Sequence, residues 1–108
     1  SKRCVIYTRV STDRQEKEGT SLETQEEKCR EYATQQGWKV VRHFSEAESG
    51  GNFLRPALNE MLESIVDDEI DVVLVYSVDR LARQQFHFSS IVNEIEEAGA
   101  IVEFVTTT

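Results

Sequence analysis

A serine and several arginines lie where the chain is predicted to leave its strands. Arg9 and Ser11 close one apolar run, and Asp79, Arg80 and Arg83 follow another. Arginine binds phosphate oxygens through a planar set of donors and stays charged. A serine hydroxyl among such cations can attack a phosphodiester, because the cations stabilise the extra negative charge of the transition state much as a metal ion would. These residue types therefore indicate metal-independent phosphoryl transfer through a phosphoserine.

Each of these groups also has a simpler interpretation. Taken alone, Ser11 is typical of an exposed serine at a strand end, and Asp79 of a residue that begins a helix carrying surface arginines. Arg55, which precedes the single proline, is a weaker indication still. His43 is predicted inside a strand and His87 inside a helix. Neither is expected to be catalytic, so a Ser-His-Asp hydrolase is not favoured.

The segments between these groups alternate between strand-like and helix-like patterns. Apolar, β-branched runs predict strands over 4–7, 38–44, 71–76 and 100–105. Polar or glycine-containing stretches predict loops over 12–19 and 46–54. One helix is predicted from a Thr20–Glu23 capping box to Gly37, where a left-handed cap suits glycine. Two further helices are predicted from apolar stripes: Leu58, Met61, Leu62, Ile65 and Val66 after Pro56, and Phe88, Ile91, Val92, Ile95 and Ala98 before Gly99.

The order βαβαβαβ predicts one α/β domain. Strands separated by single helices form right-handed crossovers, so we expect a three-layer fold. Its sheet would be mainly parallel, with four strands or slightly more, and helices would cover both faces. Ligands of such sheets bind beyond the carboxyl ends of the strands. Arg9, Ser11, Arg55 and the segment 79–83 are therefore expected at the same end of the sheet.

The overall composition points away from a simple DNA-binding domain. Twelve Lys and Arg against twenty Asp and Glu give a formal net charge of −8, so the domain as a whole should repel nucleic acid. DNA binding would need a locally basic site or another part of the protein. Cys4 and Cys29 form neither a disulfide framework nor a close metal-ligand pair. This use of cysteine fits a reducing, cytoplasmic setting best. No apolar run approaches the roughly 20 residues of a membrane span, so no membrane association is expected.

Three motifs, in this order, resemble the serine recombinases, the resolvase and invertase family. They are Tyr7–Thr12 with Gln15 and the segment 19–25, then Ser49-Gly50 with Arg55–Leu58, then Val78–Arg83. The resemblance covers essentially the whole chain. The Gly-Thr-Ser-Leu sequence at 19–22 is most similar to the large serine recombinases, the phage integrases and mobile-element transposases.

The resemblance implies a resolvase-like catalytic domain in which Ser11 attacks the scissile DNA phosphate. A 5′-phosphoserine and a free 3′-hydroxyl would result, and no cofactor, metal ion or ATP would be needed. Asp79 would either orient an arginine or help to protonate the leaving oxygen. The residues that would bind the phosphate are Arg9, Arg55, Arg80 and Arg83. The residues that would support them are Tyr7, Gln15, Gln25 and Glu46, the last at a position where small members carry Asp.

The resemblance also implies a larger assembly. Members of the family act on DNA as homodimers and synaptic homotetramers, with a dimerisation helix and DNA-binding domains after the catalytic domain. The chain lacks an initiator Met and stops directly after a strand-like run. We therefore expect residues 1–108 to be the catalytic domain of a longer protein and to be inactive alone. Two other classes stay open: a non-catalytic phosphate-binding or receiver-like signalling module, and an acidic interaction domain whose arginines are incidental.

Overall fold

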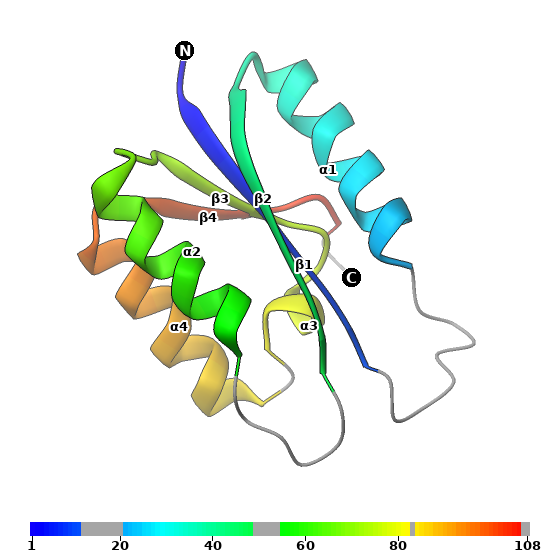
Figure 1. Ribbon diagram of the computed structural model, residues 1–108, viewed down its shortest axis with the longest axis vertical. Coiled ribbons are helices and arrows are strands. Elements are labelled where there is room, and N and C mark those ends of the chain that lie inside the picture. The colour runs from blue at the N-terminus through cyan, green and yellow to red at the C-terminus, as the bar shows by residue number, and fades with distance from the viewer. Residues whose placement is uncertain (12–20, 49–54, 83, 107–108) are drawn as a thin grey trace.

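A parallel sheet lies at the centre of the chain (Figure 1). The computed structural model describes residues 1–11, 21–48, 55–82 and 84–106. The strands are β1 (Arg3–Ser11), β2 (Lys39–Glu48), β3 (Val72–Val75) and β4 (Ile101–Phe104), in the spatial order β2-β1-β3-β4. All their pairings are parallel, and β1 pairs with β2 over its whole length but with β3 only as far as Tyr7. The predicted parallel sheet is confirmed.

Helices cover both faces of this sheet. In Figure 1, α1 (Leu22–Gln36) lies on one side, and α2 (Pro56–Asp67) and α4 (Gln85–Glu97) lie on the other. A short helix, α3 (Val78–Leu81), follows β3 and was not predicted as an element of its own. No helix in the described part of the chain is long and apolar enough to cross a membrane.

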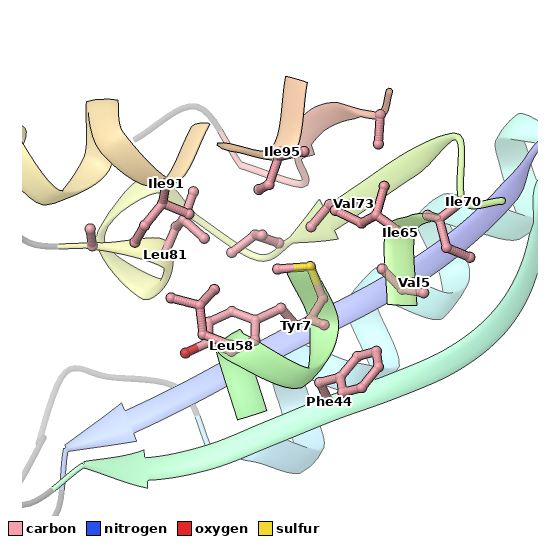
Figure 2. Close-up of a cluster of buried hydrophobic side chains, with 14 residues drawn as sticks. Val5, Tyr7, Phe44, Leu58, Ile65, Ile70, Val73, Leu81, Ile91 and Ile95 are labelled. Atoms are coloured by element: carbon pink, nitrogen blue, oxygen red, sulfur yellow. The ribbon is translucent and has the colours of Figure 1, made fainter. Parts of the chain in front are cut away.

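The alternation of side chains along β1 divides the core into two layers. Val5 and Tyr7 face α2 and α4, whereas Cys4 and Ile6 face α1. Figure 2 shows the first layer, in which the Tyr7 ring lies among core side chains and its hydroxyl is directed towards the carboxyl end of β1. Each fully buried aliphatic side chain contributes about 1.5–3 kcal/mol. Both cysteines are free and buried, and burial raises the pKa of each thiol to about 12.

Helix α1 begins one residue later than predicted. Its N-cap is Ser21, whose hydroxyl accepts a hydrogen bond from the main-chain N–H of Thr24 at 3.1 Å. Thr20, the predicted cap, lies outside the described residues. The predicted stop at Gly37 is confirmed: this glycine has φ of 79° and its N–H bonds back to the last turn.

Two other local predictions are wrong. Glu46 lies in β2 rather than in a loop, because β2 stays paired with β1 as far as Glu48. Val66 does not belong to the buried stripe of α2, since it is 65% exposed while Met61 and Ile65 face the sheet. The predicted loops over 12–19 and 49–54 lie outside the described residues.

Candidate active site

Most of the predicted site residues meet at the carboxyl end of β1. They come from β1, β2, α1, the residue before α2, and α3, so segments that are distant in the sequence contribute to one place. The residues joined there by contacts are Tyr7, Arg9, Gln25, Glu46, Arg55, Asp79 and Arg80. Ser11 is the last residue of β1, and its backbone is opposite Glu48. Gln15 and Arg83 lie outside the described residues.

Two arginines from distant segments hold the end of α3. Arg9 donates from Nε to the Arg80 carbonyl at 3.0 Å and from Nη2 to the Asp79 carbonyl at 2.6 Å. Arg55 donates from Nη2 to the Leu81 carbonyl at 2.6 Å. The last carbonyls of a helix have no partner within the helix, and cations are favoured beside them. Arg9 and Arg55 therefore satisfy the carboxyl end of α3 and fix it against β1.

A buried network links Arg55 to β1 and β2. The Tyr7 hydroxyl donates to Glu46 Oε2 and accepts from Arg55 Nη2 at 2.8 Å. Glu46 Oε2 is 3.6 Å from Arg55 Nε, and Glu46 Oε1 accepts from the main-chain N–H of Ala57 at the start of α2. Burial raises the pKa of the Tyr7 hydroxyl above its ordinary value, although Arg55 acts in the opposite direction. Tyr7 is thus a neutral phenol that bridges a carboxylate and a guanidinium.

Gln25 continues the hydrogen bonding of the sheet where β3 has ended. The β1–β3 pairing stops at Tyr7 opposite Val75. Two residues further along β1, the Arg9 N–H donates to Gln25 Oε1 at 3.2 Å, and Gln25 Nε2 donates to the Arg9 carbonyl at 3.0 Å. A side-chain amide has the same donor and acceptor as a peptide group. Gln25 therefore satisfies both main-chain groups of Arg9 in the way a neighbouring strand would.

Arg80 and Asp79 do not match the simpler interpretation of their motif, a helix-starting aspartate followed by surface arginines. Arg80 is only 6% exposed, so the alternative of a surface arginine is wrong for this residue. Asp79 Oδ2 is 3.9 Å from Arg80 Nε, and Asp79 Oδ1 accepts from the Ser77 hydroxyl at 2.6 Å. Ser77 was not among the predicted site residues. Its signal was a serine between a strand and a short helix, at a position typical of an N-cap.

Comparison with known proteins shows which family and fold the chain shares. The family described as "Resolvase, N terminal domain" matches residues 4–108. The catalytic domain of ISC1926 TnpA, an IS607-like serine recombinase, is 35% identical with a TM-score of 0.80, over 96% of this chain and 67% of that one. The N-terminal catalytic domain of TP901-1 integrase is 31% identical with a TM-score of 0.83, over 96% and 77% of the two chains.

A longer relative shows how the chain compares with a whole protein of this kind. A protein of Bacillus subtilis (strain 168), provisionally named a DNA recombinase, is 36% identical over 101 residues. The match covers 93% of this chain but 20% of that protein, so the chain spans about a fifth of its relative's length. The predicted family and fold are confirmed: the chain belongs to the resolvase N-terminal domain family and has the fold of the serine recombinase catalytic domains.

Proposed function

We propose that this chain is the catalytic domain of a site-specific DNA recombinase whose nucleophile is Ser11. The Ser11 oxygen attacks the scissile phosphorus, and the bond from phosphorus to the 3′-oxygen breaks. The serine proton is lost and the leaving oxygen gains one, which gives a 5′-phosphoserine and a free 3′-hydroxyl. Attack of a new 3′-hydroxyl on the phosphoserine reverses these steps and releases the serine. The phosphoserine ester conserves the energy of the cleaved bond, so the cycle consumes no ATP.

The observation that carries this proposal is the gathering of Arg9, Arg55 and Arg80 around the end of α3, beside the strand β1 whose last residue is Ser11. These cations lie on a protein of net charge −8. They are held by hydrogen bonds to α3 and Tyr7 and by an ion pair with Glu46, or lie within α3 itself. Donors fixed before the reaction stabilise developing negative charge without reorganisation, which makes them more effective than mobile charges.

Arg55 offers a specific donor for a phosphate oxygen. Its Nε is buried and has no hydrogen-bond partner within the described part of the chain. Leaving a buried N–H unsatisfied costs about 1–3 kcal/mol. This Nε is 3.6 Å from Glu46 Oε2, so a phosphate oxygen would accept a hydrogen bond from it only if the guanidinium turned towards the substrate.

Asp79 is proposed to orient Arg80 rather than to protonate the leaving oxygen. Both of its carboxylate oxygens already face partners, Ser77 on one side and Arg80 on the other. Tyr7, Gln25 and Glu46 would support Arg9 and Arg55 through the contacts described above. By the family resemblance, Arg83 would join the phosphate-binding arginines and Gln15 would support Ser11.

The assembly proposed for this function is larger than the chain. The acidic charge of residues 1–108 argues that DNA binding depends on further parts of the intact protein. We expect that protein to form a homodimer and a synaptic homotetramer on DNA, and to act in the cytoplasm, where its buried free thiols stay reduced. The isolated chain is expected to be inactive in recombination.

The test is covalent capture of DNA by the full-length protein on a nicked suicide substrate. Wild-type protein should accumulate a protein–DNA adduct, and Ser11→Ala should form none. Ser45→Ala is a matched control, because this serine is exposed on β2. An adduct of normal yield from Ser11→Ala would show that the nucleophile is another residue.

A further inference from the structure

A second polar network lies on the opposite face of β1, towards α1. His43 in β2 has its Nε2 2.8 Å from the Thr8 hydroxyl oxygen and its Nδ1 3.6 Å from Glu26 Oε1. Glu26 also accepts a hydrogen bond from Arg30 Nε at 2.8 Å. Thr8 is fully buried, and the His43 side chain is 19% exposed. The network therefore runs from the interior of the sheet to the surface of α1.

This network and the candidate active site are joined through chain neighbours. Thr8 precedes Arg9 in β1, and Gln25 precedes Glu26 in α1. Gln25 holds both main-chain groups of Arg9, while His43 links Thr8 to Glu26. The contacts form a closed ring, so the carboxyl end of β1 is fastened to the first turns of α1 at two adjacent points.

The partners of His43 favour a neutral imidazole that carries its hydrogen on Nδ1. Neutral imidazole has one donor and one acceptor nitrogen. A hydrogen on Nδ1 faces the Glu26 carboxylate, which leaves Nε2 to accept the Thr8 hydroxyl. Protonation would turn Nε2 into a donor to the Thr8 oxygen, so the proton of the buried Thr8 hydroxyl would lose its acceptor. The stronger attraction of the imidazolium to Glu26 would offset only part of this cost and of the cost of burying the charge. The charged groups facing the ring are Glu26, which favours the imidazolium, and Arg30, which opposes it.

We propose that neutral His43 is a positioning residue for the recombinase active site, and that its protonation loosens the Arg9 end of β1 from α1. The effect on DNA cleavage rests on the proposed function, whereas the effect on β1 does not. Burial, more than any other cause, lowers the pKa of His43 below its ordinary value. The lowered pKa favours the neutral histidine near neutral pH, so the ring would loosen only under more acidic conditions.

Amide hydrogen exchange in the chain tests the positioning role directly. The protection factor of the Arg9 amide, which donates to Gln25, is compared with that of the Val73 amide in β3. In wild-type protein, the Arg9 protection relative to Val73 should fall at least about fivefold between about pH 7.5 and 5.5. His43→Gln can still accept from Thr8 but does not titrate, so its ratio should stay constant. His43→Phe should give the low ratio at both pH values.

The proposal is overturned if the wild-type ratio does not change with pH, or if His43→Phe leaves the Arg9 protection at the wild-type level. A second arm uses cleavage of a suicide substrate by the full-length protein. Its rate should fall more steeply towards about pH 5.5 for wild type than for His43→Gln. If the cleavage rates of wild type and His43→Gln changed with pH in the same way, His43 would have no pH-dependent effect on cleavage. Hydrogen exchange needs no DNA. The exchange measurement would therefore still test the role of His43 if Ser11 proved not to be the nucleophile.

Discussion

Arginines lie at both ends of the parallel sheet, but they are held in different ways. At the amino end, Arg42 has a side chain that is 53% exposed and lies 3.9 Å from the Asp68 carboxylate. At the carboxyl end, Arg9 is 4% exposed and donates to two main-chain carbonyls of α3. Arg42 is thus a largely solvated charge, whereas Arg9 is a guanidinium fixed within the protein. Arg3, also at the amino end, is intermediate: it is part-buried and donates from Nε to the Asp68 carbonyl at 2.9 Å.

The difference in burial between these arginines indicates where the fold bears the cost of holding a charge in a fixed position. An exposed ion pair such as Arg42–Asp68 contributes little, because water screens it and two long side chains must be ordered. Burying a guanidinium is costly unless its donors find partners. Such a cost is expected where a fixed charge has a chemical use, which supports our proposal that the carboxyl end is the functional end.

The largest effect expected from this comparison is on DNA cleavage by the full-length protein. Arg80→Lys keeps the charge but loses the planar fork of donors, and should slow cleavage by about 10²–10³-fold. Arg42→Lys makes the same change at the amino end and should leave the rate within about twofold. Single-turnover rates on a suicide substrate would measure both. Near-normal cleavage by Arg80→Lys would mean that Arg80 does not grip the phosphate.

The second largest difference between the two ends is expected in the free energy of unfolding after one carboxylate is neutralised. Glu46→Gln removes the charge opposite the buried Arg55 guanidinium but retains an acceptor for Tyr7, and should lower the free energy of unfolding by about 2 kcal/mol. Asp68→Asn removes the charge opposite the exposed Arg42 and should change it by less than about 1 kcal/mol. Urea denaturation of both variants gives the comparison. Equal losses would contradict the claim that the Arg55–Glu46 pair is more desolvated than the Arg42–Asp68 pair.

The sequence predicted the fold well because its elements are defined by their own side chains. The stripe Leu58, Met61, Ile65 has helical spacing and is buried as predicted, and the apolar run at Val72–Val75 is a buried strand. Where an element is held by its neighbour instead, prediction failed. The end of β2 at Glu46 is polar and continues only because it pairs with β1.

The same distinction explains the candidate site. Arg9, Arg55 and Arg80 could be predicted to converge, because parallel strands place their carboxyl ends together. The contacts among them could not be predicted. Arg9 can cap α3 only because α3 ends beside it, and Gln25 can bond to the main chain of Arg9 only because β3 ends before that point. No local sequence pattern encodes where α3 and β3 end in space.

A smaller effect is expected from removing one hydroxyl at the carboxyl end. Tyr7→Phe deprives buried Glu46 of a donor and Arg55 of an acceptor, and should cost about 1–2 kcal/mol of unfolding free energy. Tyr32→Phe removes a hydroxyl that donates to Glu103 at a part-buried position away from the arginines, and should cost less than about 0.5 kcal/mol. Thermal unfolding of the two variants checks this. A larger loss from Tyr32→Phe would reverse the comparison.

The smallest effect is expected from removing divalent cations. If fixed guanidinium groups at the carboxyl end supply the positive charge for the transition state, EDTA should change the cleavage rate by less than about twofold. Mg²⁺ also screens DNA phosphates, so the EDTA reaction needs added monovalent salt that restores the same DNA affinity. Complete loss of cleavage in EDTA with rescue by Mg²⁺ would favour a two-metal mechanism. The buried arginines would then serve only to fix α3, and the two ends of the sheet would differ in structure but not in chemistry.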